Sequence, residues 1–124
     1  MSSYERNRPI YLQIMERIKE SIISGELALG DRILSIRDMA LEMGVNPNTM
    51  SRVYMELERE GVIETLRGTG SFVVKDKDLI PRLKKEIFEN WVLGSVSSLV
   101  EAGFTDEEII DYVKKALKRV RSEK

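Results

Sequence analysis

A cluster of short polar side chains and one arginine occurs where a helix is predicted to begin, near residue 46. Its members are Asn46, Asn48, Thr49, Ser51 and Arg52. Asparagine and arginine side chains can hydrogen-bond the major-groove edges of bases, and the free N–H groups of a first helical turn can hold a phosphate. The chemistry that this cluster offers is therefore recognition of an anion rather than catalysis.

The charge around this cluster supports the same interpretation. A first helical turn normally favours Asp or Glu, because its unpaired N–H groups and the helix dipole make it positive. Residues 43–55 nevertheless contain no carboxylate, although Asp and Glu supply 21 of the 124 residues. A second window without acids, residues 65–75, carries Arg67 and Lys75. Both windows are predicted to be kept clear for an external anion.

Each of these residues also has a simpler interpretation. Asn46 is first of all a helix cap, with Pro47 at a position where a missing N–H costs nothing. Arg52 could be solvated, and Arg37 could pair with a local acid such as Glu42. Gly68 suits a tight hairpin whatever the function, so it argues only weakly for a site.

Three helices are predicted in the first half of the chain. The first begins at Pro9 and ends before Gly25, because isoleucines recur at every fourth position from residue 10 to residue 22. The second begins after a capping Ser35 and ends at Gly44. The third runs from residue 46 to about residue 60, and the side chains predicted to be buried on it are Met50, Val53 and Leu57. Between the first two helices, residues 32–34 are predicted to form a short strand after a turn at Gly30 and Asp31.

The second and third helices are separated by a short turn containing Gly44, which is typical of a helix-turn-helix. Strand-like residues 62–66 and 71–75 follow, joined by a tip that contains Arg67, Gly68 and Thr69. The predicted fold is therefore mainly α-helical with a small β-hairpin wing: a winged helix-turn-helix domain at residues 1–75, followed by a two-helix C-terminal tail at residues 76–124.

The tail is predicted to be a polar hinge at residues 76–80, a long apolar helix that Gly103 ends, and a last helix that begins with a capping box at Thr105. Two helices are too few to cover their own apolar faces, and such helices normally pack on a partner. We therefore expect a homodimerisation surface, with an intrachain cap on the winged helix as the alternative. Its predicted contacts are Ile87, Trp91, Ile109, Val113, Leu117 and Val120.

The composition excludes several classes of function. The chain has no Cys and no His, so it offers neither a thiol nucleophile nor the commonest general base and metal ligand. We expect no enzymatic activity, no metal and no cofactor. No run of about 18 apolar residues and no signal-peptide pattern is present, so a cytoplasmic location without membrane contact is expected. The net charge of −1 means that any surface for nucleic acid must come from local arrangement.

The ordered motifs of residues 9–74 resemble the GntR family of bacterial transcription regulators. They are PIYLQI at 9–14, GEL at 25–27, GDRI at 30–33, SIR at 35–37, MA at 39–40, NT at 48–49, LEREGVI at 57–63 and GTGSFV at 68–73. The short helical tail resembles the YtrA-like branch of the family. Leu29 and Leu34 stand where the family usually has proline, which affects the local turns more than the function.

The resemblance implies a role for individual residues. Arg37 of the second helix would contact DNA, Asn48, Thr49 and Arg52 would lie in the recognition helix, and Arg67 and Gly68 would lie in the wing. It also implies double-stranded DNA as the partner and control of a transporter operon. A repressor that binds a palindromic operator as a homodimer is the expected function. A winged helix that binds only other proteins is the alternative, and the sequence identifies no effector.

Overall fold

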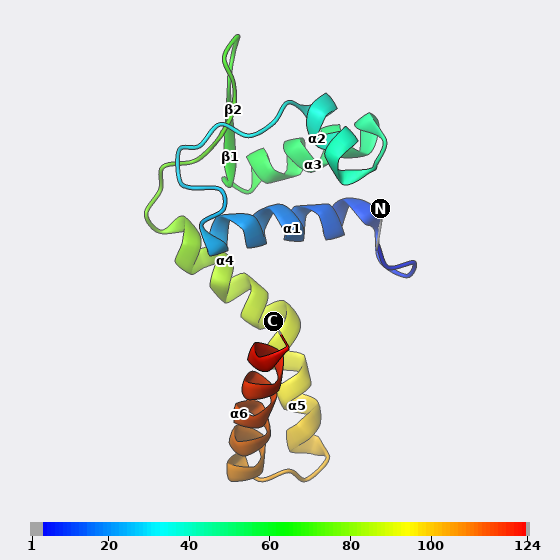
Figure 1. Cartoon of the computed structure of the whole chain (residues 1–124), viewed down its shortest axis with the longest axis vertical. Coiled ribbons are helices and arrows are strands. Elements are labelled where there is room, and N and C mark those ends of the chain that lie inside the picture. The colour runs from blue at the N-terminus through cyan, green and yellow to red at the C-terminus, as the bar shows by residue number, and fades with distance from the viewer. Residues whose placement is uncertain (1–3, 124) are drawn as a thin grey trace. The chain divides into compact units, whose positions relative to one another are not determined.

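The computed structural model describes residues 4–123, which form two compact units. The first unit extends to Leu83 and the second begins at Lys84. The predicted division at residue 75 precedes helix α4, whereas the two units divide within that helix. Figure 1 shows the order of the helices and strands along the chain.

The first unit contains the three predicted helices. Helix α1 spans Ile10–Ser24, α2 spans Ile36–Met43 and α3 spans Pro47–Arg59. Helix α1 ends at Gly25, whose φ of 88° is a left-handed conformation that glycine adopts at little cost. All three helices lie where the sequence predicts them, to within one or two residues at each end.

Helix α3 lies at the centre of the first unit and contacts α1, α2 and the first strand. Its side chains at Met50, Val53 and Leu57 are completely buried, as the sequence predicts. They meet the isoleucine stripe of α1 at Ile14 and Ile18. Because α3 is packed on one side only, its opposite side is left free for contacts outside the chain.

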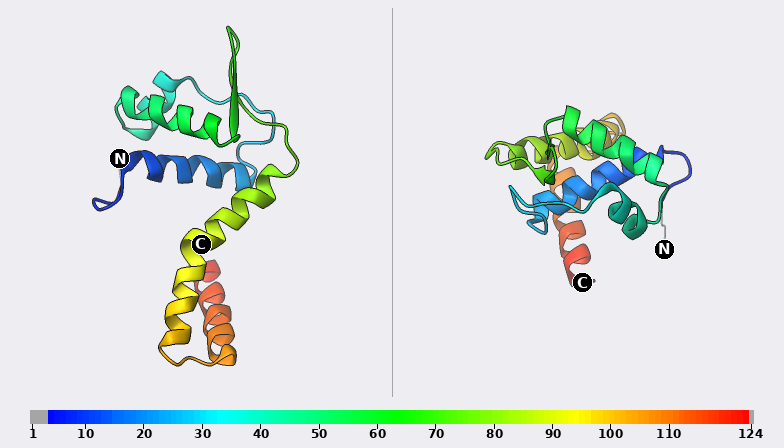
Figure 2. Two further views of the ribbon diagram at one scale, coloured as in Figure 1. Left: turned by 180° about the vertical axis from the view of Figure 1, so that it is seen from behind. Right: turned by 90° about the horizontal axis from the view of Figure 1, so that it is seen from above.

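The wing is a two-stranded antiparallel hairpin, with β1 at Ile63–Leu66 and β2 at Gly70–Val73. Ile63 pairs with Val73 at its base, and both side chains are buried there. Figure 2 shows the hairpin projecting beyond the helices of the first unit. The core thus anchors the base of the wing, and the tip extends into solvent.

The segment between α1 and α2 is not the strand that the sequence predicts. Only Arg32 forms a bridge, to Phe72 of β2, and the rest of the segment is irregular. The hydroxyl of Tyr54 in α3 donates a 2.5 Å hydrogen bond to the Leu34 carbonyl, which fixes the segment from the other side. Burial, and to a lesser extent the carboxylate of Glu42, raises the pKa of Tyr54, so this hydroxyl remains a donor.

Helix α4 begins within the predicted hinge at residues 76–80, of which only Leu79 and Ile80 are helical. Helix α4 spans Leu79–Ile87, and Leu79 and Leu83 are buried in the core of the first unit. Asp76 accepts a hydrogen bond from the Asp78 N–H and begins the turn. The sequence placed Leu79 in the hinge and Leu83 in the tail helix, so the contribution of both side chains to this core was missed.

The second unit contains the π-helix η1 at Phe88–Val92, helix α5 at Leu93–Glu101 and helix α6 at Asp106–Ser122. The sequence predicts one continuous helix through residues 81–102, whereas the π segment at residues 88–92 interrupts the α-helical pattern. Thr105 forms the predicted capping box with Glu108, which confirms how α6 begins. The rings of Phe104 and Tyr112 meet edge to face with centroids 6.1 Å apart.

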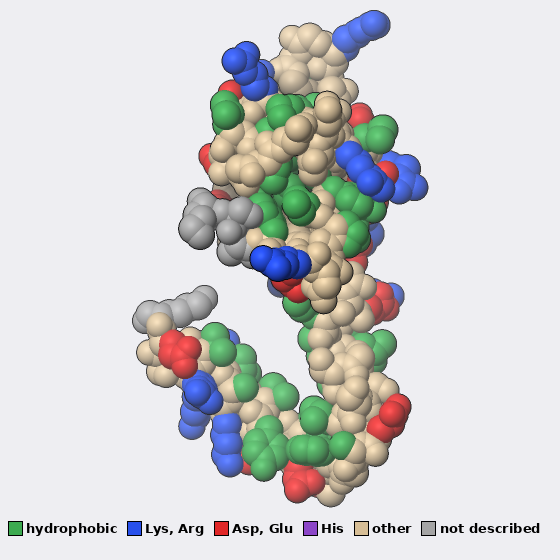
Figure 3. Space-filling view, turned by 90° about the vertical axis from the view of Figure 1, so that its right-hand side faces the viewer, with side chains coloured by type: hydrophobic (Ala, Val, Ile, Leu, Met, Phe, Trp, Pro, Cys, Tyr) green, Lys and Arg blue, Asp and Glu red, His purple; other side chains and the backbone are tan. Residues whose placement is uncertain are grey.

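The second unit has an exposed apolar surface. Among its described residues none is buried, and large side chains such as Trp91 at 49% and Val113 at 50% remain exposed. Figure 3 shows hydrophobic side chains along the surface of the tail. Leu99, Phe104, Ile109, Tyr112, Val113 and Ala116 surround a hollow of about 390 Å³ on this surface.

Candidate nucleic-acid interface

The start of α3 has the predicted cap. The Asn46 side chain accepts a 2.7 Å hydrogen bond from the Asn48 N–H, and Pro47 is the first helical residue. The first turn contains no acidic residue. The remaining N–H groups of that turn and the positive end of the helix dipole therefore have no acidic side chain within the turn to balance them.

Not every helix of the chain begins in this way. Helix α2 has Asp38 in its first turn, and α6 has three acids, Asp106, Glu107 and Glu108. Helices α1, α4 and α5 also have no acid in the first turn, but α1 differs from α3 in having no side-chain cap at Pro9. The start of α1 was not among the predicted sites, although residues 6–15 contain no acid.

The predicted recognition residues lie on the free side of α3. Asn48, Ser51 and Arg52 are exposed, and Thr49 is half-buried beside them. A hollow of about 380 Å³ brings some of them together with the start of α1, and its lining residues are Ile10, Tyr11, Asn48, Thr49 and Arg52. Ser51 does not line this hollow and stands separately on the helix surface.

Arg52 is exposed, as the simpler interpretation expects, but its side chain also contacts another residue. Its guanidinium lies over the ring of Tyr11, with the Cζ atom 3.7 Å from the ring centroid. Tyr11 was not among the predicted site residues, because it was interpreted as packed against the domain. Its position in the first turn of α1 is the signal that could have found it.

Arg37 is the second residue of α2 and is exposed. It forms no ion pair with any described residue, so the alternative pairing with Glu42 is not observed. The guanidinium is therefore available to an external partner.

The wing tip carries the other predicted residues, Arg67, Gly68 and Thr69, all of them exposed. The Thr69 N–H donates to the Leu66 carbonyl at 2.9 Å and closes the turn. Gly68 has a φ of 76°, so the tight turn explains this glycine without any ligand.

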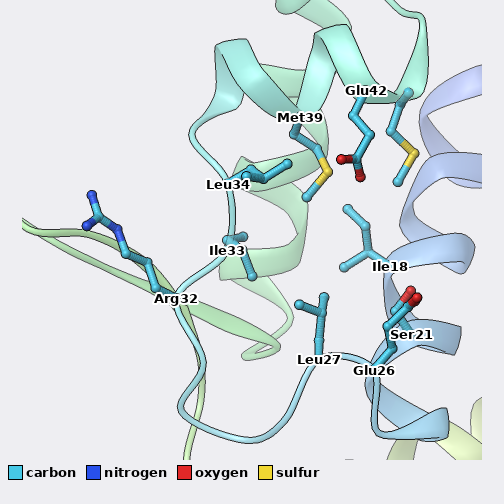
Figure 4. Close-up of a pocket in the computed structure, with 10 residues that line it drawn as sticks. Ile18, Ser21, Glu26, Leu27, Arg32, Ile33, Leu34, Met39 and Glu42 are labelled. Carbon is cyan, nitrogen blue, oxygen red and sulfur yellow. The ribbon is translucent and has the colours of Figure 1, made fainter.

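Arg32 is a further basic residue that the site prediction omitted. A Cβ atom at Gly70 would lie 2.8 Å from its Nε atom, so the guanidinium packs closely against the wing. Figure 4 shows Arg32 pointing away from a hollow between α1 and α2. That hollow, of about 350 Å³, has an apolar lining that includes Leu27 and Met39, with carboxylates contributed by Glu26 and Glu42.

No other chemistry is evident in the described residues. Among residues 4–123, no group of three or more potential metal ligands comes together. None of the described helices is both long and apolar enough to span a membrane.

A helix-turn-helix whose second helix begins without acids, followed by an anchored hairpin, defines a winged-helix DNA-binding protein. A family model described as bacterial regulatory proteins, gntR family, matches residues 10–73. The chain belongs to the GntR family. It is a transcriptional regulator with a DNA-binding domain, and not an enzyme, because members of this family are transcription factors.

Two relatives from Bacillus subtilis strain 168 match most of the chain. The uncharacterized HTH-type transcriptional regulator YhcF is 37% identical over 113 residues, covering 91% of this chain and 93% of YhcF. The HTH-type transcriptional repressor YtrA is 36% identical over 107 residues, covering 86% of this chain and 82% of YtrA.

A solved structure resembles the whole arrangement. The GntR family transcriptional regulator from Listeria monocytogenes is 38% identical, with a TM-score of 0.85 over 90% of this chain and 98% of that protein. This match covers more of the chain than residues 10–73, which the family model matches, so it extends beyond the winged helix into the tail.

Proposed function

We propose that the protein is a repressor that binds a palindromic DNA operator as a homodimer. Helix α3 enters the major groove of each half-site and the wing contacts the flanking DNA backbone. The observation that carries this proposal is the exposed, acid-free start of α3, which presents Asn48, Thr49 and Arg52 on the side away from the core.

Residue roles follow from position and charge. Arg52 and Asn48 read base edges, since arginine and asparagine can pair with guanine and adenine in the major groove. Arg37 and Arg67 contact phosphates from α2 and from the wing tip. Thr49, Ser51 and Thr69 supply hydroxyl groups, and Asn46 remains a cap that can also approach phosphate.

The apolar surface of the second unit supports the homodimer. Large apolar side chains that remain exposed in a single chain are normally covered by a partner. A second copy presents the same surface, and a two-fold dimer matches a palindromic operator. The surface includes Ile87, Trp91, Ile109, Val113, Leu117 and Val120.

The biological setting is a separate part of the proposal. The name of the relative YtrA supports repression. The YtrA-like resemblance alone supports control of a transporter operon and a cytoplasmic location of the protein. No cofactor or effector is assigned. A palindrome upstream of the gene, protected from nuclease by the protein, is the expected observation.

The variant Thr49→Glu tests the recognition helix directly. Thr49 is the third residue of α3, where a glutamate favours the helix dipole and can complete a capping box. The variant should therefore fold at least as well as the wild type but lose specific DNA binding, because the carboxylate repels phosphate. Thr49→Gln is the matched control, since it has the same shape without the charge.

The measurement is operator affinity by fluorescence anisotropy, with thermal denaturation of each variant. Binding retained by Thr49→Gln and lost by Thr49→Glu supports the proposal. Equal binding by wild type and Thr49→Glu would show that α3 does not lie on the DNA. Arg67→Ala should weaken all sequences alike and lower the salt slope by about one unit.

A further inference from the structure

The cations of this chain have partners of several kinds, among them carboxylates, backbone carbonyls and aromatic rings. Several pair with a carboxylate: Arg8 with Glu5 and Glu16, Lys19 with Glu60, Arg59 with Glu56, and Lys115 with Asp111. Arg52 forms no ion pair with any described residue and instead lies over the ring of Tyr11 at 3.7 Å. The contact joins α3 to the first turn of α1.

The kind of partner decides what a guanidinium can still do. A carboxylate occupies the N–H groups at the edge of the guanidinium and neutralises its charge. An aromatic ring contacts only the flat face, so the edge donors and the charge of Arg52 stay available. Residues 43–55 contain no carboxylate, and Glu56, one turn beyond Arg52 on α3, pairs with Arg59, so neither source competes with the ring.

The stack also restricts where the arginine points. An exposed arginine normally samples many rotamers, and fixing it in one of them on binding costs entropy. Here a half-buried Tyr11 holds the side chain in the hollow that Asn48 and Thr49 also line. The arginine is thus already held next to the other recognition residues before DNA arrives.

We propose that Tyr11 is a positioning residue for DNA recognition: by stacking on Arg52 it presents the guanidinium edge to one base pair of each half-site. The proposal rests on the proposed function, in which Arg52 reads a base. Tyr11 acts through Arg52 and need not touch the DNA itself. Sequence preference at that base pair therefore depends on a residue of α1, outside the helix-turn-helix.

The first experiment tests the stack without DNA. In the NMR spectrum of the free protein, the ring current of Tyr11 should shift the side-chain signals of Arg52 upfield. Tyr11→Leu should abolish that shift, and Tyr11→Phe should retain it because the ring remains. Wild-type Arg52 signals at random-coil positions would overturn the proposal, whatever the DNA results.

The second experiment measures binding to operators that differ at single base pairs. Arg52→Ala identifies the base pair that Arg52 reads. Tyr11→Leu should lower discrimination at that same base pair by roughly three- to tenfold, which is part of what a full bidentate contact contributes. Tyr11→Phe should restore it, and Tyr11→Leu should have no further effect in the Arg52→Ala background.

Tyr4 offers a matched control, because Arg17 stacks on its ring at 4.4 Å and neither residue belongs to α3. Tyr4→Leu should leave discrimination at the Arg52 base pair unchanged. A uniform loss over all operators in Tyr11→Leu would reduce Tyr11 to a structural or phosphate contact and overturn the proposal. Thermal denaturation separates a folding defect from either outcome.

The failure of the two proposals can be distinguished. If Arg52→Ala changes preference at no base pair, the role of Arg52 in the proposed function is wrong, and the role of Tyr11 fails with it. If Arg52→Ala changes preference and Tyr11→Leu does not, only the positioning role of Tyr11 is wrong.

Discussion

The two compact units are both built mainly from amphipathic helices, but they bury their apolar side chains very differently. The first unit contains all sixteen buried hydrophobic residues of the described chain. The second contains none, although Trp91, Leu117 and similar side chains stand on its helices. Three helices and a hairpin can surround a core, whereas two helices leave one face of each uncovered.

The units also differ in how their helices are stabilised. Helix α6 has a capping box, three acids in its first turn, and Arg119 and Arg121 in its last turn. These features stabilise a helix locally, without tertiary contacts. Helix α3 lacks acids at its start and relies on its buried face. Helix α6 can therefore stay helical before the tail packs on a partner. Helix α3 instead leaves the N–H groups of its first turn accessible.

Truncation of the chain between the two units should have the largest effect on folding and on DNA binding. A chain that ends after Lys75 loses Leu79 and Leu83 from the core of the first unit. Each buried leucine contributes about 2–5 kcal/mol, and a domain has only about 5–15 kcal/mol in total, so this chain should be largely unfolded. A chain that ends after Ile87 keeps both leucines and should fold as a monomer.

The measurement for this pair is circular dichroism with sedimentation and operator affinity. The 87-residue chain should bind the operator at least about a hundredfold more weakly than the full chain, because it loses the effective concentration of a second half-site. A full-length chain that sediments as a monomer at micromolar concentration, with affinity equal to that of the truncated chain, would contradict the dimer.

A pair of single substitutions should give the next largest effect. Leu57→Ala removes a fully buried side chain of α3 and should cost about 2–5 kcal/mol at any protein concentration. Trp91→Ala removes a side chain that is 49% exposed in one chain, so it should cost little unless a second copy covers it. With that copy, the loss should be about 3–5 kcal/mol of dimer stability and should depend on concentration.

Thermal denaturation at two concentrations, tenfold apart, separates the two cases. If the transition temperature of Trp91→Ala changes with concentration by a different amount than that of the wild type, this supports burial of Trp91 against a second copy. A Trp91→Ala transition identical to that of wild type at both concentrations would place Trp91 outside any dimer contact.

The sequence predicted what depends on local pattern. Helix limits, the caps at Ser35, Asn46 and Thr105, and the buried face of α3 follow from periodicity and capping residues. The irregular segment before Ser35 was predicted as a strand, because its alternation resembles one and only tertiary contacts reveal a single bridge.

Other features depend on contacts between distant segments. The packing of Leu79 and Leu83 into the first unit and the π segment at residues 88–92 have no local signature. The stack of Tyr11 on Arg52 joins residues 41 positions apart, so neither periodicity nor charge could reveal it. The candidate site was therefore predicted on α2, α3 and the wing, without its part on α1.

Substitutions of helix caps should have the smallest effect on stability. They compare the start of α6, which is stabilised locally, with the start of α3, which lacks acids. Thr105→Ala removes the hydroxyl that accepts from the Glu108 N–H in the capping box and should cost about 1 kcal/mol in the tail. Thr105→Ser keeps the hydroxyl and is the control. Neither variant should change the DNA-contacting residues, so operator preference should be unaffected even where dimerisation weakens.

At the start of α3, Asn46→Ala should also cost about 1 kcal/mol, because it removes the acceptor for the Asn48 N–H. Asn46→Asp keeps an equally good cap and adds a charge that the helix dipole favours, so its thermal stability should equal or exceed that of wild type. Its operator affinity should nevertheless fall below that of Asn46→Ala, since its carboxylate faces phosphate. Asn46→Asp with full stability and full affinity would show that no phosphate approaches this helix start.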